Sequence, residues 1–166
     1  MKRVKGSGLD IYNKFNKKDF YEFASVMKPI VLKVLNDKGF PTNAANDIVR
    51  QAALESSYGT KPTGTYNLGG IKYFDTTGPN RTYTVSKEDN VRYTNFDNLY
   101  DYVDYKVQLL NDRYNALEST STDDFINRLH DGKYKYSDDK EKYQELKYMK
   151  SLDRYLDYPY RFQVGG

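Results

Sequence analysis

Apolar side chains recur every three or four positions along most of the chain, which is the spacing of amphipathic helices. These runs span residues 20–35, 45–53, 99–117, 125–129 and 143–156. Polar residues and turn formers such as Gly39 and Gly132 separate the runs. Pro29 lies inside the first run and predicts a kink or a split in that helix. The pattern therefore favours a largely helical domain.

The pattern changes between residues 60 and 95, where Gly, Pro and Thr are frequent. The stretches 82–85 and 91–94 are rich in Thr, Tyr and Val and predict two short strands. The polar segment 86–90 between them suits a hairpin loop. The expected fold class is mostly α (α+β), with a small β-hairpin lobe inserted between the second and third helices. A cleft between the two lobes could hold an extended polymer.

The chain has 166 residues, a length that suits one compact domain. We expect a flexible N-terminal arm over residues 1–15, one domain over 16–157 and a C-terminal tail over 158–166. The sequence contains neither internal repeats nor a linker that would divide this domain. We take a monomer as the working expectation.

Charge and composition exclude several classes of protein. The net charge is +3, from 26 basic and 23 acidic residues without a basic stripe, which argues against nucleic-acid binding. Cysteine is absent and His130 is the only histidine, so we expect no metal site and no cofactor. No apolar run approaches the roughly 18 residues of a membrane span, so we expect no membrane insertion. The 18 Tyr suit the walls of a sugar-binding groove, although an AT-rich genome would enrich tyrosine too.

Glu55 is the strongest candidate for chemistry. Helical spacing places it on the same face as Ile48 and Ala52, and it lies near the expected end of its helix. Partial burial and the negative end of the helix dipole both disfavour the ionised carboxylate and would raise its pKa. A carboxyl group that stays protonated can donate a proton to a leaving oxygen. The alternative is a helix-end glutamate that faces solvent or pairs with Lys61 or Lys72.

Two blocks of sequence around this residue resemble a known family. The first is Gln-Ala-Ala-Leu-Glu-Ser-Ser-Tyr-Gly over residues 51–59, and the second is Asn-Leu-Gly-Gly-Ile-Lys over residues 67–72. Both are similar to the motifs of the glucosaminidase family of peptidoglycan hydrolases. The similarity extends more weakly over residues 18–156. It implies a lysozyme-like fold for the helical domain and its hairpin lobe.

The resemblance also implies roles for particular residues. Glu55 takes the position of the family's catalytic acid, which acts on the β-1,4 bond that follows N-acetylglucosamine in the peptidoglycan strand. Tyr58 replaces a family Trp and would stack on a sugar or pack. Asn67 matches an Asn ahead of the hairpin and would bind substrate or only cap a turn. Tyr114 and Tyr143 match tyrosines near the groove, or else belong to the core.

Three departures from the family pattern bear on the mechanism. Gly69 replaces a Phe beside the catalytic helix, and Ser57 and Tyr58 replace Gly and Trp. The family's second carboxylate, which lies on the hairpin, has no clear counterpart. Glu88 is the first candidate for that role and Asp75 the second, with Asp89 beside Glu88 in the same loop. The N-acetyl group of the substrate could act in its place.

The expected activity is therefore an endo-β-N-acetylglucosaminidase that acts on the bacterial cell wall. Two alternatives stay open: a lytic transglycosylase on the same fold, and a non-catalytic wall-binding or virion module. Residues 1–10 are basic and carry no hydrophobic segment, so they do not form a signal peptide. A phage lysin, or a domain excised from a secreted autolysin, fits that feature.

Overall fold

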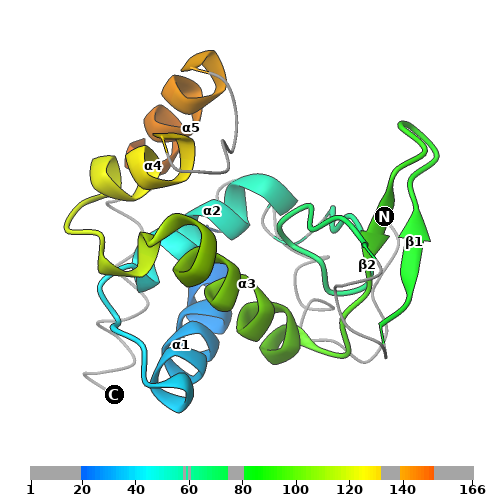
Figure 1. Cartoon of the computed structure of the whole chain (residues 1–166), viewed down its shortest axis with the longest axis horizontal. Helices are drawn as coiled ribbons and strands as arrows, with labels where there is room; N and C mark the ends of the chain where they lie inside the picture. The colour runs from blue at the N-terminus through cyan, green and yellow to red at the C-terminus, as the bar shows by residue number, and fades with distance from the viewer. Residues whose placement is uncertain (1–19, 58, 60, 75–80, 132–138, 152–166) are drawn as a thin grey trace.

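Figure 1 shows the computed structural model, which describes residues 20–57, 59, 61–74, 81–131 and 139–151. The elements in the described part are α1 (Phe20–Lys38), α2 (Ala45–Ser56), β1 (Tyr83–Val85), β2 (Arg92–Thr94), α3 (Leu99–Tyr114), a 3-10 turn (Ala116–Glu118), α4 (Thr122–Asp131) and α5 (Asp139–Ser151). This order confirms the expected mostly helical fold with one hairpin after the second helix. The predicted arm (1–15) and the predicted tail (158–166) both lie entirely outside the described residues. No helix in the described part is long and apolar enough to cross a membrane.

The first helix is continuous from Phe20 to Lys38, so the predicted split at Pro29 is wrong. Pro29 is exposed, while Met27 and Val31 on either side of it are fully buried. A proline inside a helix costs about 3 kcal/mol, mostly through a lost hydrogen bond and a clash. Burial of the apolar side chains on both sides of Pro29 outweighs that cost.

The core lies where α1 packs against α2 and α3. α3 begins at the expected position, because the Asn98 side chain accepts a 2.8 Å hydrogen bond from the backbone N–H of Asp101. Its buried face includes Val103 and Val107, which have no exposed surface. In Figure 1 this helix runs from the side of the hairpin lobe across α1.

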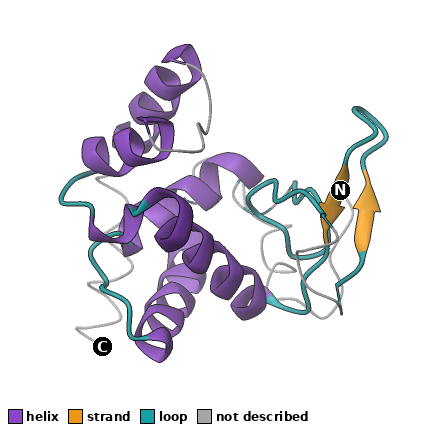
Figure 2. Ribbon diagram, viewed as in Figure 1, coloured by secondary structure: helices purple, strands orange, loops and turns teal. Residues whose placement is uncertain are grey.

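A second group of helices is formed by α4 and α5, with α5 also packed on α2 (Figure 2). The contact between α2 and α5 includes a polar link, in which Gln51 Nε2 donates to Glu145 Oε1 at 3.0 Å. Buried His130 on α4 lies 3.7 Å from the other carboxylate oxygen of Glu145. Gln51 of the first motif therefore helps to hold α5 in place.

The hairpin lobe is a small antiparallel sheet with an extra chain segment beside it. β1 pairs with β2 in a register that places Tyr83 opposite Thr94. The segment before the hairpin runs along the other edge of β2, where Lys72 bridges to Tyr93. In Figure 2 the strands lie on the opposite side of the molecule from α4 and α5. Residues 71–74 therefore sit between the hairpin and the helices.

Arg81 fixes the base of the hairpin against α3. Its guanidinium forms a 2.6 Å ion pair with Asp101 and lies over the rings of Phe96 and Tyr105, at 5.2 and 5.5 Å from their centroids. All four groups are at least partly shielded from solvent. A planar guanidinium can stack and pair at once, so this residue orients the sheet relative to the helix.

Asn67 joins the segment before the hairpin to β2. Its amide Nδ2 donates to the carbonyls of Ile71 (2.8 Å) and Thr94 (2.9 Å), and its Oδ1 accepts from the N–H groups of Ile71 (3.0 Å) and Gly69 (3.3 Å). The residue is fully buried. Its side chain thus binds four backbone groups, and the Ile71 carbonyl also accepts a 2.9 Å hydrogen bond from the N–H of Thr94 in β2.

Asn67→Ala is expected to lower the free energy of unfolding by about 3 kcal/mol, because buried donors and acceptors would lose their partners. Chemical denaturation of the purified protein measures this. The matched control is Asn95→Ala, which removes three hydrogen bonds made in solvent-exposed surroundings. Water can replace those bonds, so its effect should be about 1 kcal/mol or less. Equal losses in the two variants would contradict the structural role assigned to Asn67.

Candidate active site

Glu55 occupies the last turn of α2, as expected, and its side chain is half-buried. The helix ends one residue after it. Ser57 adopts a left-handed conformation (φ 49°), and the Ser56 hydroxyl donates to the carbonyl of Ala52 at 2.6 Å and accepts from the N–H of Gly59 at 2.9 Å. The chain turns away at this point. Glu55 is therefore left at the end of the helix that faces the hairpin lobe.

Three polar groups from two helices converge on Gly69. A Cβ atom at this position would lie 2.7 Å from the hydroxyl of Tyr102, 3.2 Å from Oε2 of Glu55 and 3.5 Å from Nζ of Lys106. Real Cβ atoms essentially never lie this close to another atom, so a side chain at position 69 would force the buried Tyr102 or the backbone to shift. The space that the family's Phe would need is occupied by the Tyr102 hydroxyl. The sequence departure at position 69 thus has a structural counterpart on α3.

Tyr102 and Lys106 are both buried on α3, one turn apart. Burial raises the pKa of the Tyr102 hydroxyl well above its usual range, and the negative charge of Glu55 raises it further. The phenol is consequently neutral in the physiological pH range and can act as a donor. Tyr102 and Lys106 thus bring a hydroxyl and an ammonium group from α3 to the backbone position that the Glu55 carboxylate also approaches.

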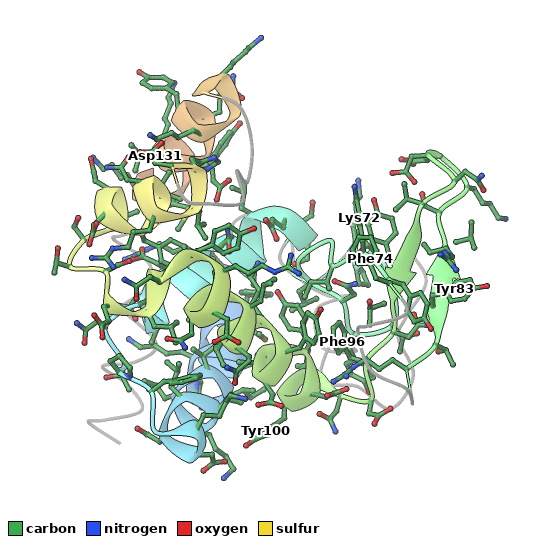
Figure 3. All side chains as sticks on the ribbon, in the orientation of Figure 1. Lys72, Phe74, Tyr83, Phe96, Tyr100 and Asp131 are labelled. Atoms are coloured by element: carbon green, nitrogen blue, oxygen red, sulfur yellow. The ribbon has the colours of Figure 1, made fainter. Side chains whose placement is uncertain are left out.

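A pocket of about 290 Å³ lies between the segment that precedes the hairpin and the second half of α3. Its described lining comes from these two elements only: Gly69, Gly70, Ile71, Lys72, Phe74, Tyr105, Lys106, Leu109, Leu110, Arg113 and Tyr114. Gly69 and Lys106 belong both to the pocket wall and to the surroundings of the Glu55 carboxylate. The pocket is therefore adjacent to the candidate acid. Figure 3 shows Lys72 and Phe74 on the segment between the helices and the hairpin.

The predicted binding residues lie in different places. Tyr114 lines the pocket beside Glu55, and its partial burial raises the pKa of its hydroxyl while the nearby Arg113 lowers it. Asn67 is buried beneath the loop, with its amide committed to backbone partners. Tyr143 is 69% exposed on α5 and borders a separate hollow with Tyr148. Tyr58 lies outside the described residues.

Two of the three candidates for the second carboxylate, Glu88 and Asp89, lie in the hairpin turn. Glu88 is exposed in the turn between β1 and β2, where its N–H donates to the Ser86 hydroxyl at 3.3 Å. Asp89 accepts from the N–H of Val91 and from the hydroxyl of Tyr93, both at 3.1 Å, and the Val91 bond is the main cause of the lowered pKa of this carboxyl. Asp89 is therefore engaged in shaping the turn. Asp75 lies outside the described residues.

Tyr102, Lys106 and Lys72 were not among the predicted site residues. Tyr102 and Lys106 each precede a fully buried valine of α3, and their four-residue spacing puts them together at the edge of the apolar stripe. A lysine and a tyrosine at this spacing, next to buried valines, could have marked the pair as candidates from the sequence. Both side chains end near Gly69, and no periodicity in the sequence shows that this distant loop lies beside α3.

A helical lobe, a small hairpin and a glutamate at a helix end between them define a lysozyme-like architecture. Residues 34–157 match the Glucosaminidase family model, described as mannosyl-glycoprotein endo-beta-N-acetylglucosaminidase. The match spans more than half of the chain, so the chain belongs to the Glucosaminidase family of glycoside hydrolases, which confirms the resemblance seen in the sequence. Among curated proteins, no significant match to the chain was found.

Several solved structures share the fold of this chain. A peptidoglycan hydrolase from Sphingomonas sp. A1 is similar at 20% identity with a TM-score of 0.65, covering 84% of this chain and 94% of the other. A mutant peptidoglycan hydrolase from the same organism is 22% identical with a TM-score of 0.63, and the match covers 83% of this chain and 99% of the other. The catalytic domain of the autolysin Auto from Listeria monocytogenes is 16% identical with a TM-score of 0.58, and the match covers 84% of this chain and 87% of the other. At these identities the likeness establishes the fold alone.

Gly69→Ala is expected to destabilise the protein by about 1–3 kcal/mol, because its new methyl group overlaps the Tyr102 hydroxyl. Tyr102→Phe in the same chain removes that hydroxyl, so the double variant should be about 1 kcal/mol more stable than the sum of the two single effects predicts. Denaturant unfolding of all four proteins gives this coupling energy.

Gly70→Ala serves as the control for that cycle. Unlike Gly69, Gly70 has a positive φ (62°), and a Cβ there would meet nothing within 4 Å. The strain of its substitution should therefore add to the effect of Tyr102→Phe without coupling. If the effects of Gly69→Ala and Tyr102→Phe on the free energy of unfolding also proved additive, the new methyl group and the Tyr102 hydroxyl would not compete for the same space.

Proposed function

We propose that this protein hydrolyses the glycan strand of bacterial peptidoglycan at the β-1,4 bond that follows N-acetylglucosamine. Membership of the Glucosaminidase family supports the class of bond. The similar solved structures are peptidoglycan hydrolases and an autolysin, which supports the polymer and an action at the cell wall. The observation that carries the proposal is the place of the Glu55 carboxylate, beside Gly69 and next to a pocket between the two lobes.

In this mechanism Glu55 protonates the glycosidic oxygen as the bond to the anomeric carbon breaks. The half-buried carboxyl group lies at the end of α2 next to the pocket, where it can deliver a proton to a bound glycan strand. The Lys106 ammonium stabilises the carboxylate that forms as the proton leaves. The Tyr102 hydroxyl, held neutral by burial, borders the same position. Glu55 therefore works between one neutral and one cationic neighbour.

The attack of water needs a second group, and Glu88 is the proposed carboxylate. Its exposed place on the hairpin turn means that it would reach the bond only if the turn approaches the cleft when a glycan strand is bound. If it does not, the N-acetyl group of the substrate is the nucleophile. Its carbonyl oxygen attacks the anomeric carbon as the glycosidic bond breaks and Glu55 protonates the leaving oxygen, and water then opens the cyclic intermediate. The two routes differ in their dependence on position 88.

Glu55→Gln is expected to lower the rate of peptidoglycan cleavage about 100- to 10,000-fold, because the amide cannot donate the proton of a carboxylic acid. A zymogram and a turbidity assay with purified cell walls measure the loss. Glu118→Gln is the matched control, since Glu118 is exposed in the 3-10 turn. Equal clearing by the parent protein and Glu55→Gln, or clearing by neither, would contradict the proposal.

The same digests separate the remaining alternatives. A reducing sugar at the new end, identified by mass spectrometry, supports hydrolysis, whereas an anhydro end would identify a transglycosylase. Glu88→Gln should lower the rate strongly if Glu88 activates water. Full activity in that variant would rule out Glu88 and leave Asp75, Asp89 or the acetamido group of the substrate for the role.

A further inference from the structure

The pocket next to Glu55 carries three basic side chains. Lys72 comes from the segment beside β2, whereas Lys106 and Arg113 lie two turns apart on α3. No acidic side chain is among the described residues that line the pocket. We name Lys72, Lys106 and Arg113 the cationic cluster. The other lining groups are apolar side chains, tyrosines and glycines, so the pocket wall is positively charged.

The scaffold holds these charges at defined positions. The carbonyl of Lys72 accepts a 3.1 Å hydrogen bond from the Thr94 hydroxyl, and the next residue, Tyr73, donates through its N–H to the carbonyl of Arg92 at 2.8 Å. Lys106 is only 4% exposed and belongs to a helix packed on the core. The cationic cluster therefore rests on paired backbone and a buried helix face.

The remaining lining suits a sugar ring. Tyr105 and Tyr114 offer rings with a hydroxyl, and the large apolar side chain of Phe74 is 58% exposed at the pocket. Gly70 leaves open space where other residues would place a side chain. A wall that combines aromatic rings with fixed cations matches a sugar that carries an acidic substituent.

We propose that the cationic cluster binds a carboxylate carried by a muramyl residue of the glycan strand, and so selects peptidoglycan over neutral chitin-type chains. This inference rests on the proposed function, because it places the muramyl residue next to the bond that Glu55 cleaves. Gly69 and Lys106 connect the pocket to Glu55, so recognition of the acid and cleavage involve neighbouring sugars. The carboxylate has two sources: the lactyl group of a peptide-free muramyl residue, or the attached stem peptide.

Binding to the full chain carrying Glu55→Gln tests the proposal without turnover. The ligands are a neutral N-acetylglucosamine tetramer, a peptide-free muramyl tetrasaccharide and the same tetrasaccharide with its stem peptides, titrated by calorimetry. We expect an acidic ligand to bind about tenfold more tightly than the neutral one, with the preference falling as salt is added. Preference for both acidic ligands, or for the peptide-bearing one alone, supports the proposal and identifies the source of the carboxylate.

Lys72→Gln and Arg113→Gln, each added to Glu55→Gln, should reduce this preference about three- to tenfold. Both residues are exposed, so the variants should fold, which circular dichroism verifies. The matched control Lys33→Gln removes an exposed lysine of α1 that pairs with Asp37 and should leave the preference intact. Equal affinity for neutral and acidic ligands, or equal weakening of both by Lys72→Gln and Arg113→Gln, would overturn the inference.

Cleavage of the same three ligands by the chain with Glu55 intact separates the two proposals. Equal cleavage of all three would leave the glycosidase function standing and would contradict the role of the cationic cluster. A binding preference for the acidic ligands without any cleavage would support the cluster and contradict the proposed function.

Discussion

The side chain of Asn67 is the constraint on which the site depends. Its amide makes four hydrogen bonds to the backbone, and these join the segment before the hairpin to β2 without exposing any of the groups to water. A buried backbone group left without a partner costs about 1–3 kcal/mol, so the segment has little freedom to take another path. This path brings Gly69 against Glu55 and sets Lys72 along β2.

Gly69 is the point on this path at which the backbone approaches the polar groups around Glu55. Because it has no side chain, the loop approaches α3 closely enough for the Tyr102 hydroxyl and the Lys106 ammonium to border the Glu55 carboxylate. A larger residue would separate the two lobes or displace the phenol. The Glu55 carboxyl group thus has a neutral hydroxyl and a cation as neighbours, both brought to Gly69 by α3.

Hydrophobic spacing in the sequence predicted the helices and the hairpin well, because burial of one face determines both. It failed at Pro29, where packing on both sides kept α1 continuous. Glu55 was predicted from its helical phase and from family resemblance. Tyr102 and Lys106 were not predicted because their polar groups contact a loop that is far away in the sequence. Long side chains of this kind can place the polar group either in solvent or in the interior, so helical spacing alone does not decide between the two. Asn67 was expected to bind substrate or to cap a turn. In the structure its side chain makes four hydrogen bonds to the backbone of the loop and of β2.

The central claim is that Glu55 faces the bond to be cleaved, with the sugar chain running through the pocket beside Gly69. A crystal structure of Glu55→Gln with a bound N-acetylglucosamine oligomer tests this most directly. The account predicts a glycosidic oxygen within hydrogen-bond distance of the side-chain amide at position 55, and a sugar ring against residues 69–74 and Tyr114. An oligomer seated instead in the hollow beside Tyr143 and Tyr148, with no bond near position 55, would contradict it.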